Sequence, residues 1–447
     1  MLNELKDKKV LLLGRSTLFS DIEIINFLSN YNIDSSRDFS QELDVIIESR
    51  SINPIEDNIS NDAYDRGIKI YKLHKLEEEM SRLLDENSTL MAIKLGSDMD
   101  RLDRLLSNEY ISDNLFIKLL NIYEWEESEF GDSSRDRDIF IHTLTRFLHI
   151  KTNERDLLYS PLSLLKLIKE SDNPELLLAL ISFPKVSFLQ KNRSKLTIKE
   201  AIAQSPYIDK KITKKLLSFK DNHIDFFLAS NPNISLDILN FLYDKNIDDI
   251  NRALASNISI DNKLFIKLLE KEPDILLQYQ PINLDRYNLA FGEAKAITSD
   301  KILSINKLLE PKVIEILVSK DIEDVDNNIL LNYNISQEII EKIYNKQNPS
   351  LYKNIALNPS TPIDILEKLY KINSYDINIR LSYNTSTPHQ ILEKLFELDD
   401  FEISKGLASN ESLDIELLNI LKIDTRLRNE LTSNQKFVDS ISRNLGL

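Results

Sequence analysis

Apolar residues recur with a step of about 26 residues through the C-terminal two-thirds of the chain. Each strong copy contains a short phrase that ends in an anchor asparagine, at Asn231, Asn257, Asn358, Asn384 and Asn410. Weaker copies end at Asn306 and Asn332, and Ser205 and Gln280 occupy the same register. In the strong copies, large apolar residues follow eight and eleven positions after the anchor. Because a separation of three lies on one side of a helix, the pattern predicts units of two helices.

Local signals predict where these helices end and begin. We expect the anchor asparagine to end the first helix, because asparagine tolerates the left-handed conformation and its amide can bond turn backbone. A row of asparagines that binds a ligand is the alternative, and we favour the structural role. Thr361-Pro362 and Thr387-Pro388 predict a capping hydroxyl before a first-turn proline, with Ser235 and Asp261 as the equivalent caps.

A single two-helix unit cannot bury its own apolar face, so the units are expected to stack into an α-solenoid. The segment from Asn358 to Leu369, NPSTPIDILEKL, and its partner from Asn384 to Pro388, NTSTP, resemble the leucine-rich repeat variant family. The resemblance extends over about 200–434 and is best over 350–421, although the unit is about two residues longer than is usual in that family. It implies a HEAT-like α-solenoid that binds through its surface, and it carries no active site.

The first 86 residues follow another rhythm. Apolar runs at 10–13, 43–47 and 68–73 predict three strands, and 21–31, 63–67 and 76–84 predict helices or helix ends. The alternation indicates an α/β module. The opening KKVLLLG, the central DVII and the later AYDRGIKI resemble a BRCT domain, while a truncated Rossmann-like or receiver-like module stays open as an alternative.

The BRCT resemblance implies a possible phosphate site. In phosphopeptide-binding members, a hydroxyl just after the first strand and a lysine in the second helix hold the phosphate. Ser16 and Thr17 are the candidate weak phosphate site here, but Asn58–Ala63 contains no lysine and the customary tryptophan is missing. We therefore expect the module to dock or to dimerise.

These observations predict a mostly α protein, an α-solenoid of two-helix repeats preceded by a small α/β, BRCT-like domain. We expect the BRCT-like domain over 1–86, divergent helical repeats over 87–200 and the regular repeat array over 201–447. The divergent stretch contains an acidic, polar segment from Glu124 to Asp138, which we expect to form a loop.

Composition excludes several kinds of chemistry. The chain of 447 residues has no cysteine, which excludes disulfides, thiolate nucleophiles and cysteine metal sites and favours a cytoplasmic setting. No secretory signal or membrane-spanning stretch is expected. The five histidines never stand three or four residues apart, so we expect no metal and no cofactor. No catalytic constellation is visible, and the sequence predicts that the protein is not an enzyme.

The net charge of −16 disfavours broad binding to nucleic acid, but residues 185–220 hold ten positive and two negative charges. The candidate residues for an anionic partner are Lys191, Arg193, Lys195, Lys199, Lys210, Lys211, Lys214 and Lys215. If they lie on the inner surface of the solenoid, they can hold an acidic protein tail or a nucleic-acid backbone. We favour a solvated face, because interleaved aromatic and arginine residues are few.

The leading functional hypothesis is a non-catalytic protein-interaction scaffold. The solenoid surface binds a protein partner, and the N-terminal module docks or dimerises. The alternative is a DNA-associated factor, related to repair or the nucleoid, that uses the BRCT-like module and the basic segment. An enzyme built on helical repeats is a third class, which the sequence does not favour.

Overall fold

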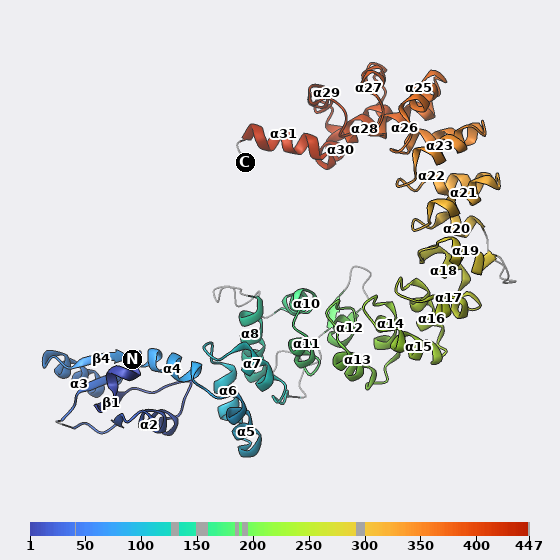
Figure 1. Cartoon of the computed structure of the whole chain (residues 1–447). Helices are drawn as coiled ribbons and strands as arrows, with labels where there is room; N and C mark the ends of the chain where they lie inside the picture. Colours follow the sequence, from blue (N-terminus) through green and yellow to red (C-terminus); the bar gives the residue numbers. More distant parts are fainter. Residues whose placement is uncertain are drawn as a thin grey trace. The chain divides into compact units, whose positions relative to one another are not determined.

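The computed structural model describes residues 1–40, 42–126, 134–148, 160–183, 187–189, 195–291 and 300–445. Its contacts divide the chain into two compact units, Met1–Asn233 and Ile234–Leu447. The protein is mostly helical, with a small parallel sheet at the N-terminus, as the sequence predicts (Figure 1). No helix within the described ranges is both long enough and apolar enough to cross a membrane.

The sheet has four parallel strands in the order β2-β1-β3-β4. Their bounds are β1 Lys9–Leu13, β2 Asp34–Ser36, β3 Val45–Glu48 and β4 Lys69–Lys72. Strand β2 is short and polar, so its sequence carries no apolar signal and we did not predict it. Four helices accompany the sheet: α1 Leu2–Leu5, α2 Asp21–Asn30, α3 Pro54–Asp65 and α4 Leu73–Arg82.

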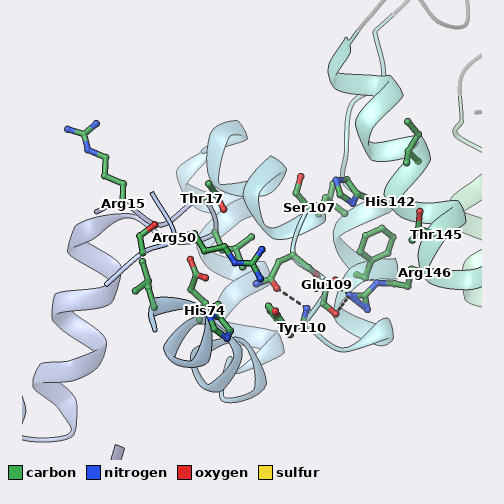
Figure 2. Close-up of a pocket in the computed structure, with 18 of the residues that line it drawn as sticks. Arg15, Thr17, Arg50, His74, Ser107, Glu109, Tyr110, His142, Thr145 and Arg146 are labelled. Carbon is green, nitrogen blue, oxygen red and sulfur yellow. Dashed lines mark hydrogen bonds between the residues drawn. The ribbon is translucent and has the colours of Figure 1, made fainter. Parts of the chain in front are cut away.

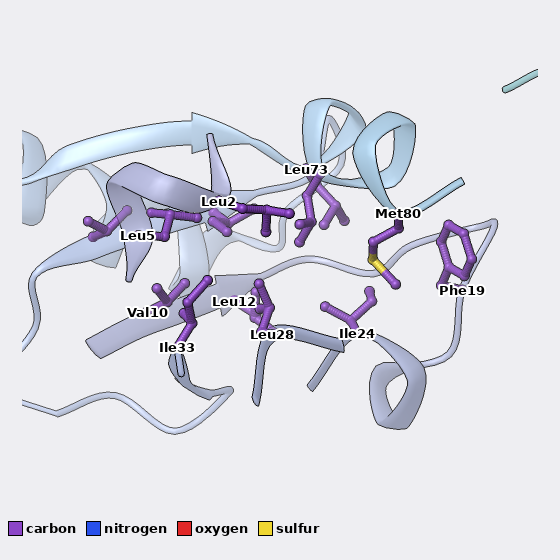
Figure 3. Packing of buried hydrophobic residues seen from close by; sticks show 13 residues of the cluster. Leu2, Leu5, Val10, Leu12, Phe19, Ile24, Leu28, Ile33, Leu73 and Met80 are labelled. Carbon is purple, nitrogen blue, oxygen red and sulfur yellow. The ribbon is translucent and has the colours of Figure 1, made fainter. Parts of the chain in front are cut away.

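Both faces of the sheet are covered, as buried parallel strands require. On one face, Val10 and Leu12 pack with α1, α2 and α4, including Ile24 and Leu76 (Figure 3). On the other face, a smaller cluster around Leu11, Leu13 and Ile46 packs against Ala63 of α3. Alternate residues of β1 therefore serve opposite cores, which explains why the run 10–13 is wholly apolar.

The predicted short helix before Gly67 is the end of α3, which begins nine residues before Ala63, at Pro54. Asn53 caps this helix, because its side chain accepts from the backbone N–H groups of Ile55 and Glu56. Gly67 adopts φ +76°, in the region that glycine favours, and it turns the chain directly into β4.

The rest of the first unit is mainly helical. Its helices are α5 Glu86–Gly96, α6 Met99–Leu106, α7 Asp113–Leu120, α8 Ser134–Leu148, α10 Pro161–Glu170, α11 Pro174–Leu180, α12 Ile198–Ala203, α13 Lys210–Leu217 and α14 Asn222–Ser230. Two findings differ from the expectation for this stretch. β5 Ser187–Leu189 and β6 Lys195–Thr197 form an antiparallel pair. The acidic loop ends earlier than expected: residues 127–133 lie outside the described ranges, and residues 134–138 form the start of α8.

The second unit is a regular array of paired helices. Its helices are α15 Leu236–Asp244, α16 Asp248–Ser256, α17 Asn262–Leu269, α18 Pro273–Tyr279, α19 Leu284–Phe291, α20 Asp300–Ile305, α21 Pro311–Ser319, α22 Glu323–Leu330, α23 Gln337–Tyr344, η2 Pro349–Leu351, α24 Tyr352–Leu357, α25 Ile363–Lys371, α26 Tyr375–Tyr383, α27 His389–Phe396, α28 Phe401–Ser409, α29 Ile415–Leu421, η3 Thr425–Leu427, α30 Arg428–Ser433 and α31 Gln435–Leu445. In this array the even-numbered helices, from α16 to α30, are the first helices of the repeats and the odd-numbered ones are the second helices. Most neighbouring first helices pack on one another more extensively than neighbouring second helices do. This packing places the first helices on the inner side of the array.

The anchor asparagines join successive repeats. The Asn384 side chain donates to the backbone oxygens of Ala356 and Asn358, at 2.7 and 2.9 Å, and accepts from the N–H of Ser386. Asn358 and Asn410 make the same pair of contacts 28 and 26 residues back along the chain. The anchors at 358, 384 and 410 are at most 1% exposed, so their side chains offer no surface for a ligand.

One detail of the anchor prediction is wrong. Asn384 has extended backbone, with φ −80° and ψ 118°, and is not left-handed. The left-handed residues stand eleven positions before the anchors, at the end of the preceding second helix. They are Lys220, Asn246, Asp321, Gln347, Asn373 and Asp399. Most of them are polar residues that tolerate this conformation, so the chain uses it to leave the second helix and not the first.

The predicted threonine caps are also wrong. Pro362 and Pro388 themselves occupy the cap position of α25 and α27. The buried Thr361 hydroxyl instead donates to the Ile355 oxygen at 2.6 Å, and Thr387 donates to Leu381 in the same way. The hydroxyl therefore binds an unpaired carbonyl at the end of the first helix. Asp261 does cap α17 as expected, by accepting from the N–H of Leu264, whereas Ser235 precedes α15 without a side-chain bond.

Candidate binding surfaces

A cleft of about 800 Å³ opens at the carboxyl ends of β1, β3 and β4 (Figure 2). Loops that follow the carboxyl ends of parallel strands are the usual place for ligand sites in open α/β sheets. The opposite wall is formed by the turn between α6 and α7 and by α8. The two walls belong to the first unit, so the N-terminal module and the first helices share one cavity.

The positive charge of this cleft comes mainly from Arg15 and Arg50. Both are exposed, and neither makes an ion pair with any residue that the structure describes. Lys72 also lines the cleft, but its ammonium is paired with Glu48. Arg146 is held by Asp113 and by the backbone oxygens of 108, 109 and 111, so it stabilises the α6–α7 turn.

Ser16 and Thr17, the two residues of the candidate phosphate site, have different surroundings in the structure. The Ser16 hydroxyl donates to the Glu77 carboxylate at 2.5 Å and accepts from the N–H groups of Leu18 and Phe19, so it is fully used. Thr17 is exposed and lines the cleft. Glu109 on the opposite wall helps burial to raise the pKa of the neighbouring Tyr110. An anion here meets carboxylates as well as arginines.

The structure places the described residues of the lysine-rich segment on separate elements. Lys191 and Arg193 lie outside the described residues. Lys195 is exposed on β6, and the four lysines 210, 211, 214 and 215 are exposed on α13, where this spacing gives one helix face. Because α13 is a second helix, these side chains do not lie on the row of closely packed first helices.

The structure does supply an aromatic centre for two of these lysines. The Lys199 ammonium lies 3.9 Å from the centre of the Phe219 ring, and that of Lys215 lies 5.7 Å from it. Lys211 is paired with Glu175 at 2.9 Å. Lys199, which stands at the start of α12, therefore lies close to Lys215 of α13 around this ring.

The second unit carries an exposed row of apolar side chains that the sequence reading did not identify. They stand one residue before or one to two residues after the anchors of four consecutive repeats, and we call them the apolar strip. Its members are Ile258, Tyr279, Ile305, Leu308, Leu331 and Tyr333. Each is 46 to 55% exposed. In the following repeats the residues directly before the anchors are the partly buried Leu357 and Tyr383 and then Ser409, and those directly after are Pro359 and Thr385, so the exposed apolar residues are concentrated in these four repeats.

A shallow cleft of about 620 Å³ lies within the strip. Ile258 and Leu308 line it together with Pro281, Ile282 and Leu309. The turns of adjacent repeats are tied here, because the N–H of Ile282 donates to the Leu308 oxygen and the Ile282 oxygen accepts from the N–H of Glu310. Backbone hydrogen bonds therefore join the two turns that form the floor of the cleft.

Arg286 is the cation of this cleft. Its guanidinium donates to the side chains of Asn262 and Gln280 and to the oxygens of Pro281 and Ile260, over 2.7 to 3.2 Å. All four acceptors are neutral, and burial lowers the pKa of Arg286. Among the described residues, no carboxylate lies within ion-pair distance of it.

One group of possible metal ligands combines a single histidine with two carboxylates, so the spacing between histidines does not reveal it. His389 and Glu393 stand four residues apart on α27, and Asp414 comes from the next repeat. One ligand atom of each lies within 4.8 Å of the others. His389 Nε2 is already 2.9 Å from the Asp414 carboxylate, in a partly exposed surface pair. We assign no ligand to this group.

Comparison with known protein families, with curated proteins and with solved structures finds no match for the chain.

Proposed function

We propose that the protein is a non-catalytic interaction scaffold whose second unit binds a protein partner through the apolar strip. The observation that carries this proposal is that each of four consecutive repeats exposes an apolar residue within two positions of its anchor. Single exposed apolar residues need no explanation, but exposed apolar residues gathered around a cleft, as Ile258 and Leu308 are, are typical of an interaction site. Stacked repeats present such residues on a continuous surface.

In this proposal the N-terminal module docks or dimerises as a BRCT-like domain. The strand order β2-β1-β3-β4, with helices on both faces, supports that resemblance. The cleft beside Arg15, Thr17 and Arg50 is the surface that we assign to docking. The repeat array likewise supports the resemblance to leucine-rich repeat variant proteins, through its step and its paired helices.

Site-specific photo-crosslinking in the native host tests the scaffold. A photoreactive phenylalanine at Tyr333 is expected to capture a partner protein. The same residue at Leu398 is the matched control, because Leu398 is 52% exposed against 49% for Tyr333 but lies outside the strip. Equal products from both positions, or none from Tyr333, would contradict the proposal.

A DNA-associated role is the second candidate. The lysine face of α13, together with Lys199 and Lys215 around Phe219, favours it. Binding through these residues predicts an affinity for duplex DNA that falls with salt, by a slope of roughly 0.9 per phosphate contact. Changing Lys210 and Lys214 to Glu would then lower both the affinity and the slope. Unchanged binding by that variant would remove the candidate.

A further inference from the structure

The Phe219 ring and the lysines around it form one continuous surface in the first unit. Phe219 follows α13 and is 37% exposed. The ammonium groups of Lys199 and Lys215 lie 3.9 and 5.7 Å from the centre of its ring. Lys210 and Lys214, one turn apart, extend this surface along the exposed face of α13. We call these five residues the lysine–phenylalanine surface.

The ammonium groups of this surface are not neutralised by carboxylates. Its four lysines form no ion pair with any residue that the structure describes, whereas the neighbouring Lys211 is paired with Glu175. Lys220, directly after the ring, is also exposed. The carboxylates nearest in sequence each accept a hydrogen bond from a backbone N–H at the start of a helix, and they are Glu200, Asp209 and Asp221. A local excess of positive charge therefore remains in a protein of net charge −16.

An exposed ring among ammonium groups offers two kinds of contact to one ligand. The ammonium groups attract the phosphates of any nucleic acid, and the ring stacks with any base, because every base has a π-face. In a duplex the bases are paired and stacked on one another, so their faces cannot reach a ring on a protein surface. In a single strand the faces are open. An acidic peptide uses the ammonium groups alone and leaves the ring without a stacking partner.

We propose that the lysine–phenylalanine surface binds single-stranded nucleic acid, with a base stacked on Phe219 and neighbouring phosphates held by Lys210, Lys214 and Lys215. The Lys199 ammonium lies over the ring, so the base takes the part of the ring that stays exposed. The inference rests on the second candidate function, the DNA-associated role, and specifies the form of its ligand. It is independent of the apolar strip.

Fluorescence anisotropy with the full-length chain tests this proposal at low salt. The probes are a labelled oligothymidine of about 20 nucleotides and a duplex of the same length, which exceed the usual site size of a single-strand binding surface. We expect the single strand to bind at least about tenfold more tightly than the duplex. Polyglutamate of the same length is the acidic-peptide probe, and we expect it not to displace the strand at equal charge concentration.

Variants of the protein locate the binding. Phe219→Leu is expected to weaken the single strand at least about fivefold without changing the salt dependence, whereas Phe219→Tyr retains the affinity. Lys214→Gln is expected to lower the salt slope by roughly 0.7, the value for one phosphate contact on a single strand. Phe241→Leu and Lys263→Gln are the matched controls and are expected to leave binding unchanged. Phe241 is 50% exposed, with the Lys245 ammonium 5.2 Å from its ring centre, and Lys263 is exposed on α17.

The outcomes separate this inference from the candidate function on which it rests. Equal affinity for strand and duplex, equal losses in Phe219→Leu and Phe241→Leu, or displacement by polyglutamate would overturn the single-strand proposal. If Lys214→Gln then still weakens the duplex, the DNA-associated role stands with a duplex as its ligand. If neither probe binds, both the inference and the candidate fail, and the scaffold proposal is unaffected.

Discussion

Replacing the buried anchor Asn384 by alanine is expected to uncouple two neighbouring repeats. The side chain makes three hydrogen bonds, two to backbone oxygens of the preceding repeat and one from the N–H of Ser386. Each contributes roughly 1 kcal/mol net, and the buried oxygens that lose their donor add a desolvation penalty, so the expected loss is about 3 kcal/mol. Asn419→Ala is the matched control, because Asn419 is exposed on α29.

Native-state hydrogen exchange, followed by mass spectrometry alongside urea unfolding, measures this loss. Faster exchange is expected first in the segments from 352 to 410, because each repeat contacts mainly its neighbours. Asn384→Asp tests the donor role, since a carboxylate facing two carbonyls is worse than alanine at pH 7 and recovers when acid protonates it. A loss below about 1 kcal/mol for Asn384→Ala, or an Asp variant as stable as the Ala variant, would refute the argument.

Three further changes probe other contacts. Gly406→Ala is expected to lower the melting temperature and Ser382→Gly to restore part of the loss, because an added Cβ at 406 would lie 1.9 Å from the Ser382 Oγ and 2.9 Å from Cδ2 of Tyr383. Asp326→Asn alone is expected to cost about 2–3 kcal/mol in urea unfolding, because it leaves the Lys346 ammonium with only the more distant Asp321 carboxylate, at 3.5 Å, and the Val318 oxygen. Asp326→Asn with Lys346→Leu is expected to be near neutral. Hydrogen bonds from Ser112 and Lys118 lower the pKa of Glu86. The contribution of Glu86 to the free energy of unfolding is therefore fully present above pH 4.5 and is lost as the pH falls through the lowered pKa. Glu86→Gln should therefore destabilise by under about 1 kcal/mol at pH 7 and less in acid, as thermal unfolding across pH will show.

The repeat array is the part of the fold that the sequence predicts best. Its apolar residues at eight and eleven positions after each anchor are local signals, and they become the buried faces of second helices such as α25 and α27. For the anchors, the sequence predicts the helix ends but not the hydrogen bonds that join successive repeats. A hydrogen bond from Asn384 to Ala356 joins residues 28 positions apart, and local helix-end rules contain nothing about such contacts.

The binding surfaces were mostly hidden, for physical reasons that differ from case to case. Tyr279, Ile305 and Leu331 stand directly before successive anchors, so a repeat alignment already contains the strip, but only the structure shows that these side chains are exposed. The cleft in the first unit needs two walls that are remote in sequence. Thr17 and Arg50 meet there only because β1 and β3 are adjacent and parallel.

The buried anchors stabilise the repeats, and the exposed residues beside them in the chain are the ones that we assign to binding. Asn306 and Asn332 are buried and fixed by their repeats, whereas Ile305 and Tyr333, beside them in the chain, face solvent. The strip can therefore change its side chains while the anchors keep the repeat spacing.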